Sequence, residues 1–241
     1  MNIHVVGDSH SAYCYENFLE TQIYWLGPVT MHRFARDGFD VLDQLLPTLS
    51  KEDFLMVVVG EIDIRCHVVG VAAKKGRDVE DVCRELATNF VEKLTAYTER
   101  HGINAIISQP MFPANRRPNP DLPFVGTVEE RVEAHYFLSS FLSEQCRVKN
   151  ISFLKLPSEF RGRDGLLARK YSDDGVHIVP CEAAPLVKSL QKLIGRKCRF
   201  KRDIILILKR RFRYYTGQKL RRQGIPKSQP LEFFNSGITS E

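Results

Sequence analysis

Short, continuous apolar runs alternate along this chain with longer segments in which apolar residues recur every three or four positions. A run that is apolar throughout suits a strand covered on both faces, and the longer period suits an amphipathic helix. Regular alternation of the two predicts an α/β fold, a three-layer sandwich with a mainly parallel sheet. The expected strands are residues 3–6, 55–59, 103–107 and 151–156, with a weaker candidate at 29–34, and the expected helices are 40–49, 79–100, 128–147 and 181–194.

Charge divides the chain into two unequal parts. Residues 1–195 carry 22 Lys and Arg against 26 Asp and Glu, a net charge of −4. Residues 196–241 carry 13 against 3, a net charge of +10. We therefore expect one main domain over residues 1–195, a basic amphipathic helical extension over 196–223, and a flexible tail over 224–241.

The basic extension has an apolar stripe at helical spacing. Its members are separated by three or four positions: Phe200, Ile204, Leu208, Phe212 and Tyr215. An amphipathic helix surrounded by Lys and Arg favours an anionic membrane surface as a partner of residues 196–222. Packing of the stripe against the main domain is the simpler alternative. Nucleic acid is the least favoured partner, although aromatic residues do interleave with the arginines.

The cysteines and the apolar runs bear on the protein's setting. Six cysteines occur without a C-x-x-C pair or zinc-like spacing, which is typical of reduced thiols and predicts no bound metal or cofactor. The longest apolar runs, 54–60 and 204–208, are too short to span a bilayer. The first residues do not show the basic stretch followed by an apolar run that is typical of a signal peptide. We expect a cytoplasmic protein, peripheral at a membrane if the basic extension binds one.

Two short motifs at opposite ends of the main domain carry the chemistry. Ser9 follows the first expected strand in a Gly-Asp-Ser-His segment, and Asp174 and His177 stand three positions apart just before a predicted helix. A serine hydroxyl, an imidazole base and a carboxylate that orients it are the three parts of serine-based acyl transfer. The joint occurrence of both motifs predicts Ser9 as the nucleophile, His177 as the base and Asp174 as its partner.

These motifs resemble those of the SGNH, or GDSL-like, hydrolases. The first block of that family matches residues 7–10, and its D-x-x-H block matches residues 174–177. The resemblance extends over roughly residues 1–195 and implies a flavodoxin-like sheet and ester hydrolysis. It also implies an oxyanion hole that includes the N–H groups of Ser9 and of a glycine after the second strand, which we assign to Gly38.

The third block departs from the family pattern. It reads Gly60-Glu61-Ile62-Asp63, with Ile62 where the family has an asparagine that binds the oxyanion. Isoleucine has no donor, and loss of one such bond costs about two to three orders of magnitude in rate. One hypothesis is that Arg65 or His67 supplies the missing donor. The alternative is a local salt-bridged turn of Glu61, Asp63 and Arg65.

Two side chains next to Ser9 admit several roles. Asp8 and His10 are candidates to line the pocket or tune the nucleophile, although helix capping and packing explain them as well. Their D-x-H spacing also fits the opening motif of metal-dependent phosphoesterases. That alternative lacks the Gly-Asn-His segment of those enzymes and leaves Asp174 and His177 without a role.

The sequence therefore predicts a serine esterase, or a related acyl transferase, that acts on a small-molecule or carbohydrate ester. An O-acetyl ester of a sugar is the first substrate to test, because many members of the resembled family act on such esters. The loss of the asparagine motivates a second interpretation, in which the chain keeps the fold but binds its ligand without catalysis. The metal-dependent phosphoesterase is the third.

Overall fold

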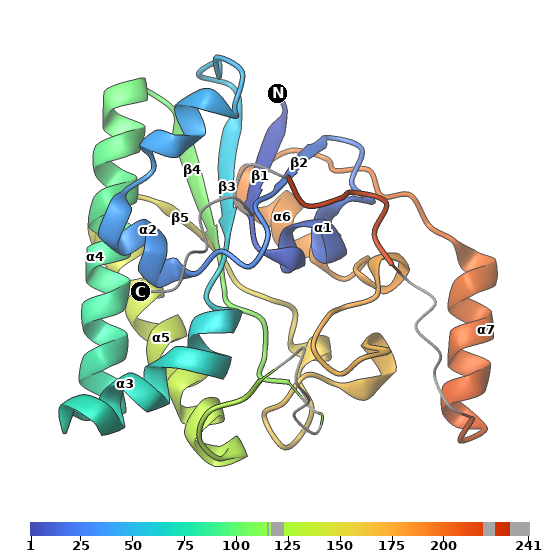
Figure 1. Cartoon of the computed structure of the whole chain (residues 1–241). Coiled ribbons are helices and arrows are strands. Elements are labelled where there is room, and N and C mark those ends of the chain that lie inside the picture. Colours follow the sequence, from blue (N-terminus) through green and yellow to red (C-terminus); the bar gives the residue numbers. More distant parts are fainter. Residues whose placement is uncertain (115, 117–122, 219–224, 232–241) are drawn as a thin grey trace.

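A computed structural model describes residues 1–114, 116, 123–218 and 225–231 of the chain. Figure 1 shows a central sheet with helices on both faces and one helix standing at the edge of the molecule. The five strands are all parallel and lie in the order β2-β1-β3-β4-β5, which confirms the flavodoxin-like α/β sandwich. The strands are β1 (Ile3–Gly7), β2 (Thr21–Trp25), β3 (Phe54–Val58), β4 (Asn104–Ser108) and β5 (Ser152–Leu154).

Two apolar cores cover the two faces of the sheet. Successive strand residues point to opposite faces, so Leu55 and Val57 of β3 join one core while Met56 and Val58 join the other. The first core holds α2 (Met31–Asp37), α3 (Val68–Lys75), α4 (Val79–His101) and α5 (Val128–Val148) against the sheet. The second holds α1 (Ser9–Tyr15) and α6 (Leu186–Ile194), and α7 (Ile204–Tyr215) lies outside both cores (Figure 1).

The second strand lies at a different place from the one predicted. Residues 29–34 are not a strand, because Thr30 caps α2 and its hydroxyl accepts a hydrogen bond from the Arg33 N–H. The true second strand, β2, lies at the edge of the sheet and is only partly buried. Its mixed sequence, Thr-Gln-Ile-Tyr-Trp, therefore lacks the continuous apolar run that marks a strand buried on both faces.

Several predicted boundaries also change. The helix expected at 40–49 is a short 3₁₀ helix, Asp40–Gln44, and the one expected at 181–194 is divided into a 3₁₀ turn, Pro180–Glu182, and α6. In the basic extension only α7 is helical among the described residues. Part of the segment predicted as a flexible tail contacts the domain, because the Leu231 N–H donates to the Trp25 carbonyl. Residues 224 and 232–241 lie outside the described residues.

The cysteines agree with the sequence analysis. All six are free thiols, and five of them are buried. No helix in the described part of the chain is both long enough and apolar enough to cross a bilayer.

Gly7 lets β1 approach β3 closely at the edge of the sheet that carries Ser9. A Cβ atom on Gly7 would lie 1.9 Å from the Val58 carbonyl oxygen, which accepts a hydrogen bond from the Asp8 N–H. We expect Gly7→Ala to lower the free energy of unfolding by about 3 kcal/mol or more, because backbone atoms must move apart. Chemical denaturation measures this change.

The matched control is Gly38→Ala. Gly38 also has a positive φ, of 81°, but a Cβ atom there meets nothing within 4 Å. Its cost is then backbone strain alone, about 1–2 kcal/mol. Equal destabilisation by the two substitutions would contradict the close approach at Gly7.

Candidate active site

Ser9 stands where β1 turns into α1. Asp8 is the N-cap of this helix, and its carboxylate accepts a hydrogen bond of 2.8 Å from the backbone N–H of His10. Ser9 is the first residue of α1, so its N–H belongs to the first turn, whose donors have no acceptor within the helix. The strand and the cap thus place a hydroxyl beside backbone donors that suit an anion.

A distant loop brings the other two residues of the triad to Ser9. One Asp174 oxygen accepts hydrogen bonds of 2.8 Å from the N–H groups of Val176 and His177, which closes the loop into a tight turn. The other Asp174 oxygen lies 2.7 Å from His177 Nδ1. His177 Nε2 in turn lies 2.8 Å from Ser9 Oγ. The three residues form one continuous chain of hydrogen bonds from carboxylate to hydroxyl.

The charges along these three hydrogen-bonded residues suit His177 as a general base. Burial alone would raise the pKa of Asp174, but the hydrogen bonds from the His177 side chain and from the N–H groups of His177 and Val176 hold it well below its ordinary value. Asp174 is therefore a carboxylate that accepts the His177 Nδ1 hydrogen, which leaves Nε2 free to accept the Ser9 proton. Burial, together with the positive charge of His10, lowers the pKa of His177, which favours the neutral ring that a general base needs.

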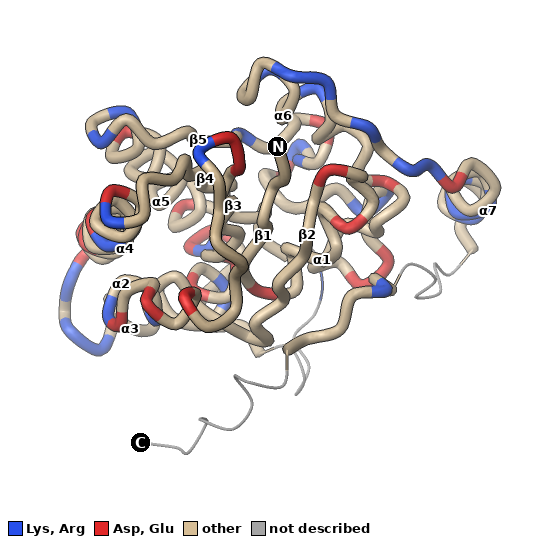
Figure 2. The backbone as a smooth tube through the Cα atoms, turned by 90° about the horizontal axis from the view of Figure 1, so that it is seen from above, with Lys and Arg blue, Asp and Glu red and all other residues tan. Residues whose placement is uncertain are grey.

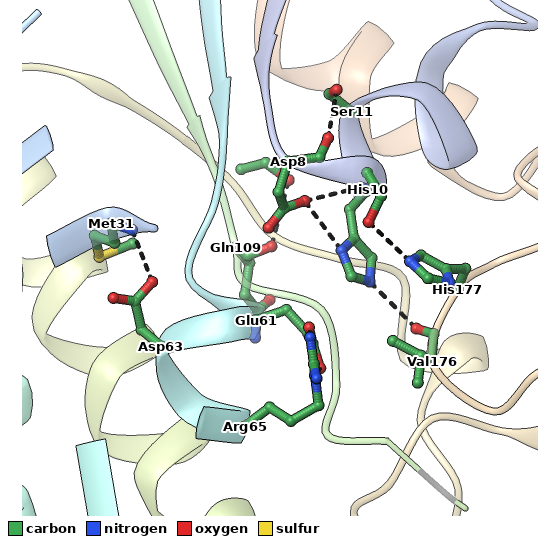
Figure 3. A network of polar contacts seen from close by, with 12 residues as sticks. Asp8, His10, Ser11, Met31, Glu61, Asp63, Arg65, Gln109, Val176 and His177 are labelled. Atoms are coloured by element: carbon green, nitrogen blue, oxygen red, sulfur yellow. Dashed lines mark hydrogen bonds and ion pairs between the residues drawn. The ribbon is translucent and has the colours of Figure 1, made fainter. Parts of the chain in front are cut away.

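His10 links the two motif loops. Its Nδ1 lies 3.1 Å from Asp8 Oδ1, and its Nε2 lies 3.2 Å from the Val176 carbonyl oxygen (Figure 3). Both ring nitrogens face acceptors, so both carry hydrogens and the ring is a cation. Burial opposes that charge, yet Asp8 outweighs it and raises the pKa of His10 to about 9. The cation lies beside His177, with 4.8 Å between the ring centres.

No family model and no curated protein matches the chain. Among solved structures, it resembles a proposed platelet activating factor from Streptococcus pneumonia, at 16% identity over 80% of this chain and 83% of that one, with a TM-score of 0.57. It also resembles a proposed acylhydrolase from Bacteroides fragilis, at 17% identity over 80% of this chain and 86% of that one, with a TM-score of 0.53. A third similar structure is a proposed SGNH hydrolase from Slackia heliotrinireducens, at 14% identity over 81% of this chain and 99% of that one, with a TM-score of 0.52.

The chain has the SGNH hydrolase fold. At these identities the likeness is one of fold, and the roles of individual residues rest on the geometry of this chain. That geometry brings together all three residues predicted for the triad, and it places Asp8 and His10 directly beside them.

Gly38, the predicted oxyanion glycine of the SGNH pattern, does not fit that role. Its N–H donates to the Phe34 carbonyl at 2.9 Å and closes the C-terminus of α2, so this donor is already engaged. The error follows from the misplaced second strand. The first glycine after β2 is Gly27, two residues beyond Trp25, and Trp25 pairs with Gly7 at the end of β1. Gly27 was missed because β2 lacks a strand-like apolar run.

The variant third block of the SGNH pattern is a structural junction. Glu61 and Arg65 form a buried ion pair, with Arg65 Nε 2.9 and 3.1 Å from the two Glu61 oxygens, while Arg65 Nη1 donates to the Pro123 carbonyl at 3.1 Å. Asp63 is not part of this pair. Its carboxylate accepts from the N–H groups of Met31 and His32 and holds the start of α2, on the far side from His10 (Figure 3).

The predicted salt-bridged turn is therefore present only in part, as the Glu61–Arg65 pair. Two Arg65 donors are committed to protein acceptors, and the guanidinium lies 5.9 Å from the centre of the Phe124 ring. The hypothesis that Arg65 or His67 replaces the missing asparagine stays a prediction.

The residues that prompted the metal-dependent alternative are bonded to one another. Asp8 and His10, its two expected ligands, share a hydrogen bond, and the second ring nitrogen of His10 faces the Val176 carbonyl. Over residues 1–114, 116, 123–218 and 225–231, no cluster of three or more Cys, His, Asp or Glu side chains has the arrangement of a metal site.

The cation on His10 predicts a pH dependence. His177 faces Asp174, His10 and Glu61, and of these His10 lowers its pKa while the two carboxylates raise it. A general base works only when neutral, so activity falls as the pH drops through the pKa of His177. We expect His10→Gln to remove the repelling charge, raise that pKa, and move the acidic limb of kcat/KM toward higher pH.

A matched control is His101→Gln, at the exposed C-terminus of α4. This substitution should leave the pH profile of kcat/KM on an activated ester unchanged. An acidic limb that stays in place in His10→Gln, with activity otherwise retained, would mean that His10 serves only to pack the two loops.

Proposed function

We propose that this protein is a serine esterase of the SGNH type. The observation that carries the proposal is the chain of short contacts, 2.8 Å from Ser9 Oγ to His177 Nε2 and 2.7 Å from His177 Nδ1 to Asp174. These distances are those of a nucleophile, its base and an orienting carboxylate before substrate binds.

The proposed reaction proceeds through an acyl-enzyme. Ser9 Oγ attacks the ester carbonyl carbon while its proton passes to His177 Nε2, and the carbonyl oxygen becomes an oxyanion. Collapse of this intermediate breaks the ester bond, and His177 gives its proton to the departing alcohol. Water, activated by His177 in the same way, then releases the acid and restores Ser9. Asp174 stays ionised throughout and stabilises the imidazolium.

Backbone donors are proposed to hold the oxyanion. The N–H of Ser9 lies in the first turn of α1, where no acceptor within the helix engages it. The second proposed donor is the Gly27 N–H, which belongs to the same edge of the sheet because β2 and β1 end side by side. Such donors act in a site whose base is buried, where each is worth more than in water.

An acyl ester is the proposed substrate class, and an acetyl ester of a carbohydrate is the first candidate. This candidate rests on the resemblance of the motifs to the SGNH family. Turnover of aryl acetate, butyrate and longer esters, compared with acetylated sugars, would identify the acyl group. Transfer to a sugar hydroxyl instead of water would appear as an acylated acceptor.

The serine chemistry is tested by labelling with a fluorophosphonate probe. We expect the wild type to react, because His177 activates Ser9, and Ser9→Ala to be inert. The control is Ser140→Ala, which removes an exposed hydroxyl on α5 and should label as wild type. A folded wild-type protein that fails to label would instead favour the interpretation as a non-catalytic binding protein. That interpretation rests on Ile62, which stands in place of the oxyanion-binding asparagine.

Arg65 is proposed to act through stability. Removal of one partner from a buried ion pair leaves an unpaired buried charge, so Arg65→Ala should lower the free energy of unfolding by about 3–5 kcal/mol. The double variant Arg65→Ala with Glu61→Gln should recover much of that loss. Denaturation of both variants, with kcat of the folded protein on an activated ester, measures the two effects. A loss of about a hundredfold in kcat from folded Arg65→Ala would assign Arg65 to the oxyanion instead.

A further inference from the structure

Helix α7 is attached to the domain by charge. Arg210 is buried, with 2% of its side chain exposed, and it pairs with Asp173 and Glu182 at 2.5 and 3.1 Å. Arg211 adds a second contact to Glu182 at 3.1 Å. Asp173 directly precedes Asp174 in the sequence, so the helix is fixed to the loop that carries two residues of the triad.

The apolar face of α7 points away from the domain. Its large residues share high exposure and are spaced so that they form one stripe along the helix: Ile204 (63%), Ile205 (67%), Leu208 (63%), Phe212 (64%) and Tyr215 (76%). The alternative that the predicted stripe packs on the domain holds only for Phe200, which precedes α7 and packs against Phe18. The domain side of α7 itself holds Arg210. An apolar stripe of this size that faces water calls for a partner.

Positive charge borders the stripe on both sides. Lys209 follows Ile205 by four residues, and Arg211 follows Leu208 by three, so both lie beside the stripe on the helix surface. The segment before α7 adds five exposed basic residues: Arg196, Lys197, Arg199, Lys201 and Arg202. Figure 2 shows this basic segment running along the edge of the molecule into α7.

We propose that α7 docks the protein on an anionic membrane surface. The five apolar residues of the stripe enter the boundary between headgroups and acyl chains, and the bordering Lys and Arg contact anionic headgroups. The Arg210–Asp173 pair then holds the catalytic loop at a fixed position relative to the lipid surface. Docking requires only this helix and its basic approach, and it does not depend on the proposed esterase activity.

Other partners fit the stripe less well. A second copy of the chain would bring two strongly basic segments together, and like charges repel. Single-stranded nucleic acid is recognised by stacking on aromatic rings, whereas three of the five stripe residues are aliphatic. Anionic lipid matches both the aliphatic stripe and the positive border.

Co-sedimentation with vesicles tests the proposal on the full chain. We expect binding to vesicles of phosphatidylcholine with phosphatidylserine, and little binding to phosphatidylcholine alone. The double variant Leu208→Asp with Phe212→Asp should weaken binding by at least about tenfold, because each change removes apolar area and adds a repelled charge. The control Tyr136→Asp replaces an equally exposed residue, 66%, on α5 and should bind as wild type.

The outcomes separate docking from catalysis. Ser9→Ala should bind vesicles as wild type does, and circular dichroism checks that the double variant remains folded. Absence of binding to phosphatidylserine vesicles, or binding that the double variant leaves unchanged, overturns the proposal. Sedimentation velocity detects the competing partner: a dimer that the double variant dissociates, without vesicle binding, would assign the stripe to a second copy.

Discussion

The buried His10 imidazolium holds together the two halves of the candidate active site. The first half is formed by β1 and α1, and the second by a loop near residue 175, far away in the sequence. His10 reaches from the Asp8 carboxylate in one half to the Val176 carbonyl in the other, at 3.1 and 3.2 Å. Because Ser9 and His177 are neighbours of these two residues, the same link sets the distance between nucleophile and base.

This link also sets the charges around the base. A cation next to His177 and a carboxylate behind it have opposite effects on its pKa, and burial adds to the effect of the cation. Tyr13 lies against the His177 ring, with 4.3 Å between the ring centres, so packing as well as hydrogen bonding fixes the imidazole of His177. Two residues of α1, His10 and Tyr13, thus add to what Asp174 and burial do for the orientation and the pKa of the base.

The third block and α7 show how charge is used elsewhere in the chain. Buried arginines at positions 65 and 210 each pair with carboxylates and link separate segments of the chain: Arg65 also donates to the Pro123 carbonyl, and Arg210 attaches α7 to Asp173. Such pairs are costly to desolvate, and removal of one partner leaves an unpaired buried charge. In α7 this attachment by charge leaves the apolar residues facing outward, which is the reverse of an ordinary surface helix.

The sequence by itself determined the α/β class, four of the five strands, the long helices α4 and α5, and the three residues that form the hydrogen-bonded chain at Ser9. Periodicity and turn motifs are local properties, so the sequence carries them directly. Tertiary structure decided the rest. The edge strand β2 lacks a continuous apolar run, so the second strand was predicted at the wrong place. The glycine after that strand was therefore assigned to Gly38. The direction of the stripe on α7 depends on which partners Arg210 finds in space, and helical spacing alone cannot say which face a helix turns toward its domain.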